Sequence, residues 1–305
     1  MQRYIVRRVL QGIVSIFALS LIVFVLVRLS GDPRHVLLGE NYTPEQWEEM
    51  GRRWALDEPI PVQYWIFVRN LASGDFGDSF YWKEPALKLV AQRLPATAQL
   101  AAAALGLSIV VGMSLGIVSA VKRDTWVDYV SKVLAVMGQS IPAFWLGIIL
   151  IWVFAVTLNV LPPSGREGPR YIVLPAVTLS WFVVAGIMRV TRSAMLDVLD
   201  SDYIRTARAK GLHERVVIWV HALRNALIPV VTFIGILLGT FLTGFVVVET
   251  IFSWPGMGLL AIKGIQLHDY AIVQAVVIFG GTVFIVTNLL VDILYAYLDP
   301  RVKYH

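Results

Sequence analysis

Cysteine and charged residues are scarce in this 305-residue sequence. Cysteine is absent, which excludes disulfides and thiolate metal sites. Charged residues make up 15% of the chain and hydrophobic residues 57%, whereas an ordinary globular domain has about 25% and about 45–50%. One soluble core does not need so much apolar sequence. The composition therefore predicts a membrane protein and excludes a disordered chain.

The common motifs of catalysis are also missing. The sequence has no G-x-x-x-x-G-K-[ST] phosphate loop, no H-E-x-x-H and no G-x-S-x-G. Gly256-Met257-Gly258 continues into leucines and does not form a dinucleotide fingerprint. The five histidines lie far apart, without the spacing of metal ligands. We therefore expect no catalytic residue, no metal site and no cofactor bound by this chain.

Six long apolar runs predict six transmembrane helices. The first run, residues 9–27, has no charged residue, and about 20 apolar residues are needed to cross about 30 Å of hydrocarbon. We expect it to be an uncleaved anchor. The runs are residues 9–27, 98–121, 136–158, 172–188, 227–248 and 273–297.

Lysine and arginine predict the orientation of these runs. With the N-terminus inside, the inner segments hold 15 of these residues and the two short outer loops hold three. Because cytoplasmic loops are enriched in Lys and Arg, we expect both termini in the cytoplasm and a multi-pass protein of the cell membrane. The same placement explains the net charge of +5 without a nucleic-acid partner.

The long outer segment before residue 95 is predicted to contain helices. Thr43 to Gln46 reads as an N-cap, a proline at the first helical position and a capping-box glutamine. Trp47, Met50 and Trp54 then share one helical face, and a second aromatic stretch starts at Pro61. Both stretches fit amphipathic helices at the outer interface, or a small exposed subdomain that packs on itself.

Several residues within the runs have structural or functional interpretations. Pro142 is expected to break the start of the third run, and Gly112-x-x-x-Gly116 permits close helix packing. Asp292 lies in the last run, one turn after Asn288, and Glu249 is expected close to water at the outer end of the fifth run. An intramembrane carboxylate is a functional candidate, so a stand-alone ion-coupled transporter using Asp292 or Glu249 is the alternative function.

The inner loop, residues 189–226, contains a short predicted helix. Ser201 and Asp202 are good N-caps, and Gly211 stands where a left-handed residue ends a helix. The residues between form about two turns with a basic rim and a face of small residues. Such a short helix is marginal alone, so we expect packing to hold it. The rim is Arg205, Arg208 and Lys210, and the small residues are Ala207 and Ala209.

This loop resembles the E-A-A-x-x-x-G loop of ABC-importer permeases. Arg205-Thr206-Ala207 stands where E-A-A would be, and Gly211 stands at the glycine. Other segments resemble the oligopeptide/dipeptide/nickel permease family along the whole chain. They are LSGDP (29–33), GDFGDSF (74–80), RLPATAQL (93–100), SIPAFWLG (140–147), RNALIP (224–229), VVVETIFSWPGMG (246–258) and NLLVDILYAYLDPR (288–301).

The resemblance implies an all-α integral membrane protein with the six-helix, N-in and C-in, type I ABC importer permease fold. Such a subunit is not an enzyme. It forms half of a pathway for peptides or a related small solute, beside a second homologous permease. Two cytoplasmic ATPase subunits, which carry ATP and Mg, bind the loop helix, and an extracytoplasmic solute-binding protein delivers the solute.

The resemblance also implies a domain division and two sets of site residues. Residues 1–28 are the tail and first helix, 29–94 the outer segment, 95–298 the permease core and 299–305 the cytoplasmic tail. The residues expected to couple to the ATPases are Asp202, Tyr203, Arg205, Thr206, Ala207, Arg208, Lys210 and Gly211. Those expected at an outer gate or docking turn are Glu249, Trp254, Pro255, Gly256, Met257 and Gly258.

Overall fold

A computed structural model describes residues 2–298 apart from 30–33, 35–37, 39–41, 54, 243 and 244. Helices are the only extended regular elements in this described part, which confirms the all-α prediction. The chain forms two compact units, Met1–Thr97 with Pro255–His305, and Ala98–Trp254. Each unit is described by itself below.

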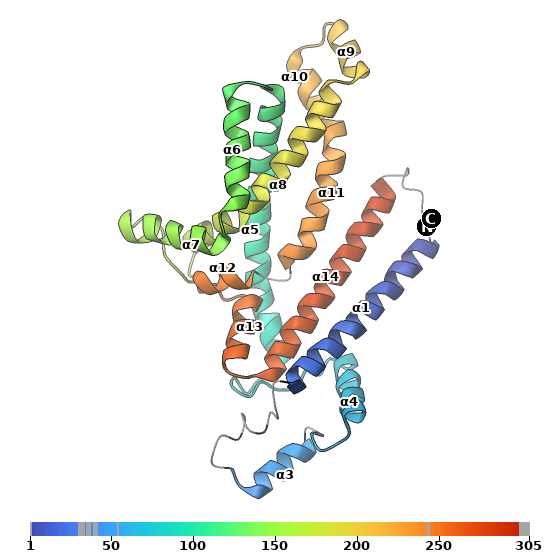
Figure 1. Cartoon of the computed structure of the whole chain (residues 1–305), viewed down its shortest axis with the longest axis vertical. Helices are drawn as coiled ribbons and strands as arrows, with labels where there is room; N and C mark the ends of the chain where they lie inside the picture. The colour runs from blue at the N-terminus through green and yellow to red at the C-terminus, as the bar shows by residue number, and fades with distance from the viewer. Residues whose placement is uncertain are drawn as a thin grey trace. The chain divides into compact units, whose positions relative to one another are not determined.

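The first unit joins the two ends of the chain. Helix α1 packs along α14, and the two run side by side in Figure 1. Their backbones approach closely at Gly12, where an added Cβ would lie 3.2 Å from Ile285 Cγ2, and at Gly281 opposite Leu19. The helices of this unit are α1 (Gln2–Leu29), α3 (Pro44–Arg53), α4 (Ile60–Ala72), the start of α5 (Ala86–Val121), α13 (Met257–Gln266) and α14 (Tyr270–Leu298).

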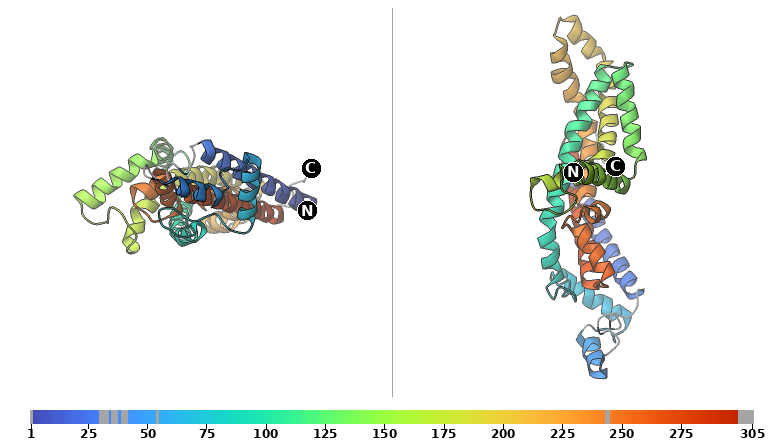
Figure 2. Two further views of the ribbon diagram at one scale, coloured as in Figure 1. Left: turned by 90° about the horizontal axis from the view of Figure 1, so that it is seen from below. Right: turned by 90° about the vertical axis from the view of Figure 1, so that its left-hand side faces the viewer.

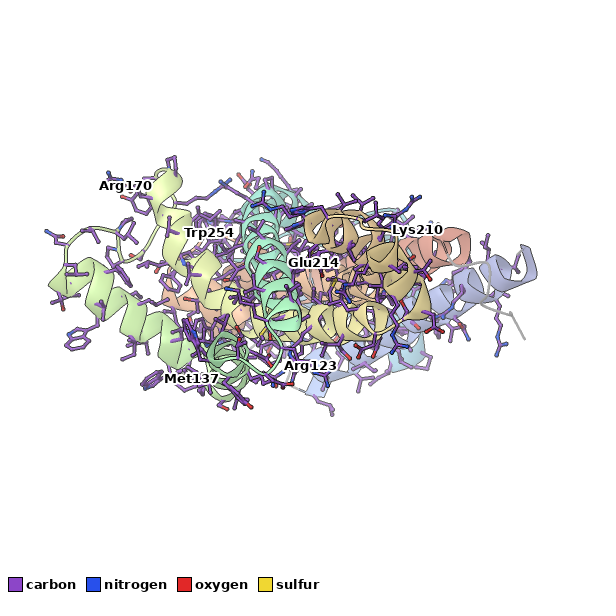
Figure 3. The ribbon with its side chains drawn as sticks, turned by 90° about the horizontal axis from the view of Figure 1, so that it is seen from above. Arg123, Met137, Arg170, Lys210, Glu214 and Trp254 are labelled. Atoms are coloured by element: carbon purple, nitrogen blue, oxygen red, sulfur yellow. The ribbon has the colours of Figure 1, made fainter. Side chains whose placement is uncertain are left out.

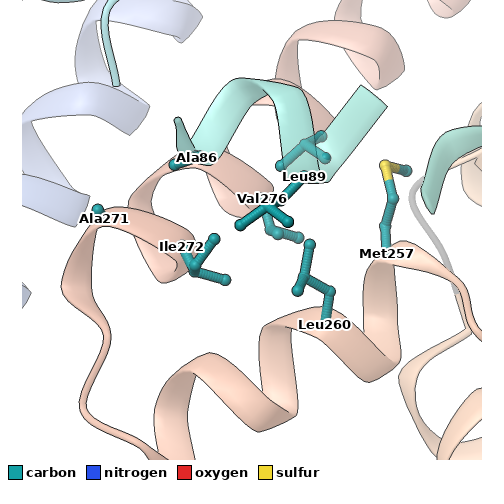
Figure 4. Close-up of a cluster of buried hydrophobic side chains, with 9 residues drawn as sticks. Ala86, Leu89, Met257, Leu260, Ala271, Ile272 and Val276 are labelled. Atoms are coloured by element: carbon teal, nitrogen blue, oxygen red, sulfur yellow. The ribbon is translucent and has the colours of Figure 1, made fainter. Parts of the chain in front are cut away.

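A buried cluster fixes the start of α5 against α13 and α14. Val90, Met257, Ile272 and Ala275 are fully buried in it, and Figure 4 shows Met257 and Ile272 with their labelled neighbours in the cluster. The segment 74–80 is held to the same place by Ser79, whose hydroxyl donates to Asp269 Oδ2 at 2.5 Å. Both side chains are buried, so this bond anchors the outer segment to the turn before α14.

The second unit is built around α8. This helix packs on α6, α7 and α11, and α5 approaches it closely because Gly116 lacks a Cβ, which would lie 2.6 Å from Thr191 Cβ. Beyond α5 the elements are α6 (Trp126–Ser140), α7 (Ala143–Leu150), η1 (Ile151–Thr157), η2 (Pro169–Ile172), α8 (Val173–Leu199), α9 (Asp202–Ala209), α10 (Glu214–Val216), η3 (Val217–Ala222), α11 (Leu223–Leu242) and α12 (Val246–Ile251).

Five helices of the described residues are long and apolar enough to cross a membrane. A sixth crossing requires α6 and α7 with η1 to count as one, and these are bent by 104°. The expected third run, residues 136–158, is therefore not one straight helix. Figure 1 shows the corner between α6 and α7, and Pro142 stands between these two helices in the sequence, as expected. Figure 2 shows further views of the same ribbon. Because proline disfavours a helical conformation in the residue before it, Ile141 is extended (φ −88°, ψ 119°) and α6 ends.

The helices do not begin and end where the fourth and fifth apolar runs do. Helix α8 continues to Leu199, because residues 189–199 contain no glycine or proline to end it. The next long helix already starts at Glu214, well inside the segment expected as loop. It ends at Leu242, and the separate helix α12 occupies the end of the expected run 227–248. The inner loop is thus reduced to the few residues around α9.

The outer segment forms the helices that its sequence predicts. Thr43 and Gln46 bond reciprocally, each backbone N–H donating to the other side chain, as a capping box requires. Helix α4 packs on α1. The ring of Tyr64 lies edge-on to that of Phe24, with the ring centres 5.3 Å apart, and the Tyr64 and Ser20 hydroxyls form a hydrogen bond of 3.0 Å. For α4 the structure therefore favours packing on the chain itself. Trp54 and most of the LSGDP segment lie outside the described residues.

Candidate functional site

Helix α9 follows α8 after a single turn. Ser201 is extended before it (φ −76°, ψ 153°), as an N-cap residue should be. Its hydroxyl, however, donates back to Val198 O at 2.5 Å and does not cap α9. At the other end, Gly211 has φ +76°. The left-handed glycine was predicted. The N–H groups of Gly211 and Leu212 donate to Arg208 O and Ala207 O at 2.9 and 3.4 Å, which is a Schellman arrangement.

One face of α9 is buried against its own unit. Ile204 is fully buried and Ala207 is 8% exposed. Both belong to a hydrophobic cluster with Met195 of α8, Val217 of η3 and Ala222. The two small residues of the predicted face thus differ, since Ala207 is buried and Ala209 is exposed. The buried face fixes α9 to the ends of the long helices, so a force on α9 reaches those helices directly.

The opposite face of α9 is exposed, and most of its charged residues are basic. Arg205 pairs with Asp202 at 3.3 Å, and Arg208 makes two bonds to Glu214, at 2.7 and 3.1 Å. This pair raises the pKa of Arg208, chiefly through the hydrogen bond, so the guanidinium stays charged. Figure 3 looks onto this end of the unit, where Lys210 and Glu214 are labelled. The exposed residues are Asp202, Tyr203, Arg205, Thr206, Arg208, Ala209, Lys210 and Gly211.

A buried charge cluster holds together α5, α6 and α8, the helix that precedes α9. Asp128 of α6 is fully buried and receives two bonds from Arg192 of α8, at 2.8 and 2.9 Å. Ser119 of α5 donates to it at 2.5 Å, and Lys132 pairs with it at 2.8 Å. Because every oxygen is paired, the carboxylate stays ionised at low cost and links three helices near the α9 end.

The expected outer turn is buried in this chain. Glu249 was expected close to water, but its side chain is fully buried, as are Trp254 (1% exposed) and Met257. On one side of the turn the Arg166 guanidinium lies 5.7 Å from the Trp254 ring centre. On the other, Met257 N–H donates to Thr97 Oγ1 at 2.8 Å. Pro255 is partly exposed, whereas Gly256 and Gly258 are buried, so docking at this turn stays a prediction.

The residues of the alternative function are only partly described. Asn288 lines a groove between α1 and α14 of about 660 Å³, together with Arg7 and Arg8. Asp292 falls outside the residues whose side chains the structure describes. Among the described residues no group of three or more His, Asp or Glu side chains could hold a metal ion.

Two known protein families match this chain, one in each part of the sequence. The family described as "binding-protein-dependent transport system inner membrane component" matches residues 112–304. The N-terminal family of such membrane components matches residues 1–101. This chain belongs to that family of transport permeases. The stretch 205–211 and the other quoted segments thus pointed to the right family, and membership does not favour a stand-alone ion-coupled transporter.

Curated relatives align with the permease over its full length. A dipeptide transport system permease protein of Alkalihalophilus pseudofirmus is 38% identical, with all of both chains covered. Glutathione transport system permease proteins of Pectobacterium atrosepticum and Escherichia coli K12 are 41% and 40% identical, again over the whole of each chain. The permease is therefore an inner-membrane, multi-pass subunit of a binding-protein-dependent transport system.

Sequence reasoning missed two buried acids of the permease. Asp128 stands four residues before Lys132 at the start of α6, a spacing that signals an ion pair, but nothing in the sequence indicated Arg192 as its main partner. Asp269 lay unremarked in a short turn, although it holds Ser79 from a distant segment. Both acids depend on partners that only the tertiary structure brings close.

Proposed function

We propose that this permease forms half of the transmembrane pathway of an ATP-driven importer of di- or oligopeptides. Helix α9, residues 202–211 with its cap, transmits the motion of the ATPases to the pathway. The subunit itself hydrolyses no ATP and binds no cofactor. ATP and Mg are held by two cytoplasmic ATPase subunits, and a second homologous permease completes the pathway.

The two faces of α9 carry this proposal. Ile204 on the inner face is fully buried, so α9 cannot move without the cluster that includes Met195 and Val217. On the exposed face, Arg205 pairs with Asp202 and Arg208 with Glu214, and Lys210 adds a further positive charge. A rigid helix with one anchored face and one basic, accessible face is suited to sit in a partner's groove and to pass a displacement on.

Topology and similarity support the remaining parts of the proposal. The excess of Lys and Arg in inner segments supports a cytoplasmic position of α9 and of both termini, on the side of the ATPases. The solute-binding protein then docks on the opposite side. Peptides are the proposed solutes because the relatives cited above are permeases of dipeptide and glutathione transport systems.

Charge reversal on α9 tests the proposal. In Arg205→Glu, the exposed guanidinium becomes a carboxylate, while the buried face is untouched. We expect loss of ATP-dependent peptide uptake and of ATPase co-purification, with normal amounts of the permease in the membrane. Arg208→Glu should do the same, and it also places two carboxylates together with Glu214.

The matched control is Arg170→Glu, an equal charge change on an exposed residue at the other end of the α8 span. Uptake should be close to normal in this variant. If Arg205→Glu and Arg170→Glu both supported normal uptake, α9 would not be the contact with the ATPases.

A further inference from the structure

Arg189 is the first charged residue of α8 and lies deep along it. The first 16 residues of the helix, 173–188, carry no charge. At about 1.5 Å per residue, Arg189 lies about 24 Å from the outer start of α8, within a hydrocarbon layer of about 30 Å. Its side chain is exposed on the surface of the second unit. An exposed arginine at such depth is a functional candidate, because lipid is a poor solvent for its charge.

The direction of this side chain argues against a lipid-facing position. Arg189 Nη1 donates to Gln139 Oε1 at 2.8 Å, and Gln139 lies at the end of α6, about 20 Å from the cytoplasmic start of that helix. The guanidinium therefore points into the membrane, towards the corner at Pro142. An arginine among lipids would extend the other way, to the headgroups.

The corner adds further polar groups at the same depth. Helix α6 ends at Ser140, whose hydroxyl donates to Val136 O at 3.0 Å, and Met137 O accepts from the N–H of Ile141. The Gln139 and Ser140 side chains are both exposed. Irregular backbone at membrane depth is tolerated where it is buried in protein or lines a water-filled cavity, and broken helices often mark solute sites in transporters.

We propose that Arg189, oriented by Gln139, lines the solute pathway and binds the C-terminal carboxylate of the peptide as it passes this corner. A guanidinium carries five N–H donors in a planar fork that matches a carboxylate, and the bond to Gln139 uses one of them. The inference rests on the proposed function, since it takes peptides as the solute.

Uptake of a peptide and of its amide tests this assignment. The complete transporter is reconstituted in vesicles with a saturating amount of its binding protein, and initial rates are measured for trialanine and trialanine amide. The affinity of the isolated binding protein for each probe is measured separately. The acid-to-amide ratio of uptake is then corrected for the preference of the binding protein. We expect Arg189→Gln to lower the acid-to-amide ratio of uptake at least fivefold. Arg170→Gln, on the same span, should leave it unchanged.

The outcomes separate this inference from the proposed function. An acid-to-amide ratio that stays within twofold of wild type in Arg189→Gln would overturn the role of Arg189, whatever the total rate. If that variant does not assemble, Arg189→Lys decides, because it keeps the charge and loses the fork. Its ratio should fall about threefold, and an unchanged ratio would again overturn the role. A wild-type transporter that takes up neither probe would instead refute peptides as the solute.

Discussion

Removing the buried anchor of α9 should free this helix while leaving its exposed face intact. In Ile204→Ala, a fully buried side chain is truncated within a cluster that joins α9 to α8 and η3. Such truncations cost about 2–5 kcal/mol. Because α9 has only eight residues and little stability of its own, we assign the loss to local detachment of the helix.

The expected size of the effect follows from this cost. At one factor of ten for each 1.4 kcal/mol, a loss of about 2–5 kcal/mol raises the detached population about 30- to 4,000-fold. Hydrogen exchange of the α9 amides should accelerate by the same factor, since exchange proceeds from the open form. ATP-dependent uptake should fall, whereas the ATPases should still bind, because the exposed residues are unchanged.

Exchange measured by mass spectrometry in lipid nanodiscs provides the assay, and Thr206→Ala provides the control. Thr206 is exposed on the same helix, and its hydroxyl bonds only to Asp202 O within the helix, at 2.9 Å. Its loss should change exchange by less than threefold. If Ile204→Ala left the exchange of α9 as slow as Thr206→Ala does, the buried face would not be what holds the helix.

Two further predictions concern the end of α9 and the cluster behind it. Gly211→Pro should abolish uptake with the protein still in the membrane, because proline cannot adopt φ +76° or donate to Arg208 O. Gly211→Asn, which tolerates the left-handed conformation, should retain uptake; equal uptake in both variants would contradict the role of the cap. Asp128→Asn should lower stability by about 3–5 kcal/mol because it breaks a buried pair and leaves Arg192 without its carboxylate. This loss would appear as a lower melting temperature of the permease in detergent. The control Asp124→Asn changes an exposed turn residue and should melt at the wild-type temperature. Equal melting temperatures of the two variants would refute the argument.

The sequence predicted helix ends correctly where the residues that form the end are neighbours in the chain. The capping box at Thr43 and Gln46 and the left-handed glycine at 211 were predicted correctly, because each depends on neighbouring residues. Pro142 was likewise expected to interrupt its helix, since proline acts on its own backbone and on the residue before it. The angle of 104° was not predictable, because the packing of α7 against α8 and α12 sets it.

Hydrophobicity alone gave poor limits where helices extend beyond the apolar runs. Charged residues ended the fourth run at residue 188, but the helix continues to Leu199 because Arg192 is neutralised by Asp128 and Met195 is buried. Similarly, residues 214–226 were expected to belong to the inner loop, although Val217 and Ala222 anchor that stretch as helix in the cluster around Ile204.

The sequence by itself determined that this chain is a helical membrane permease of the binding-protein-dependent family. Composition, apolar runs and quoted motifs are properties of the chain in any conformation, so they needed no structure. The tertiary structure decided which residues are accessible and which are paired. It buried Glu249 and Ala207, joined Asp128 to Arg192, and turned Arg189 towards the corner at Pro142. Burial and pairing between distant segments arise only when helices pack, because they depend on which faces meet.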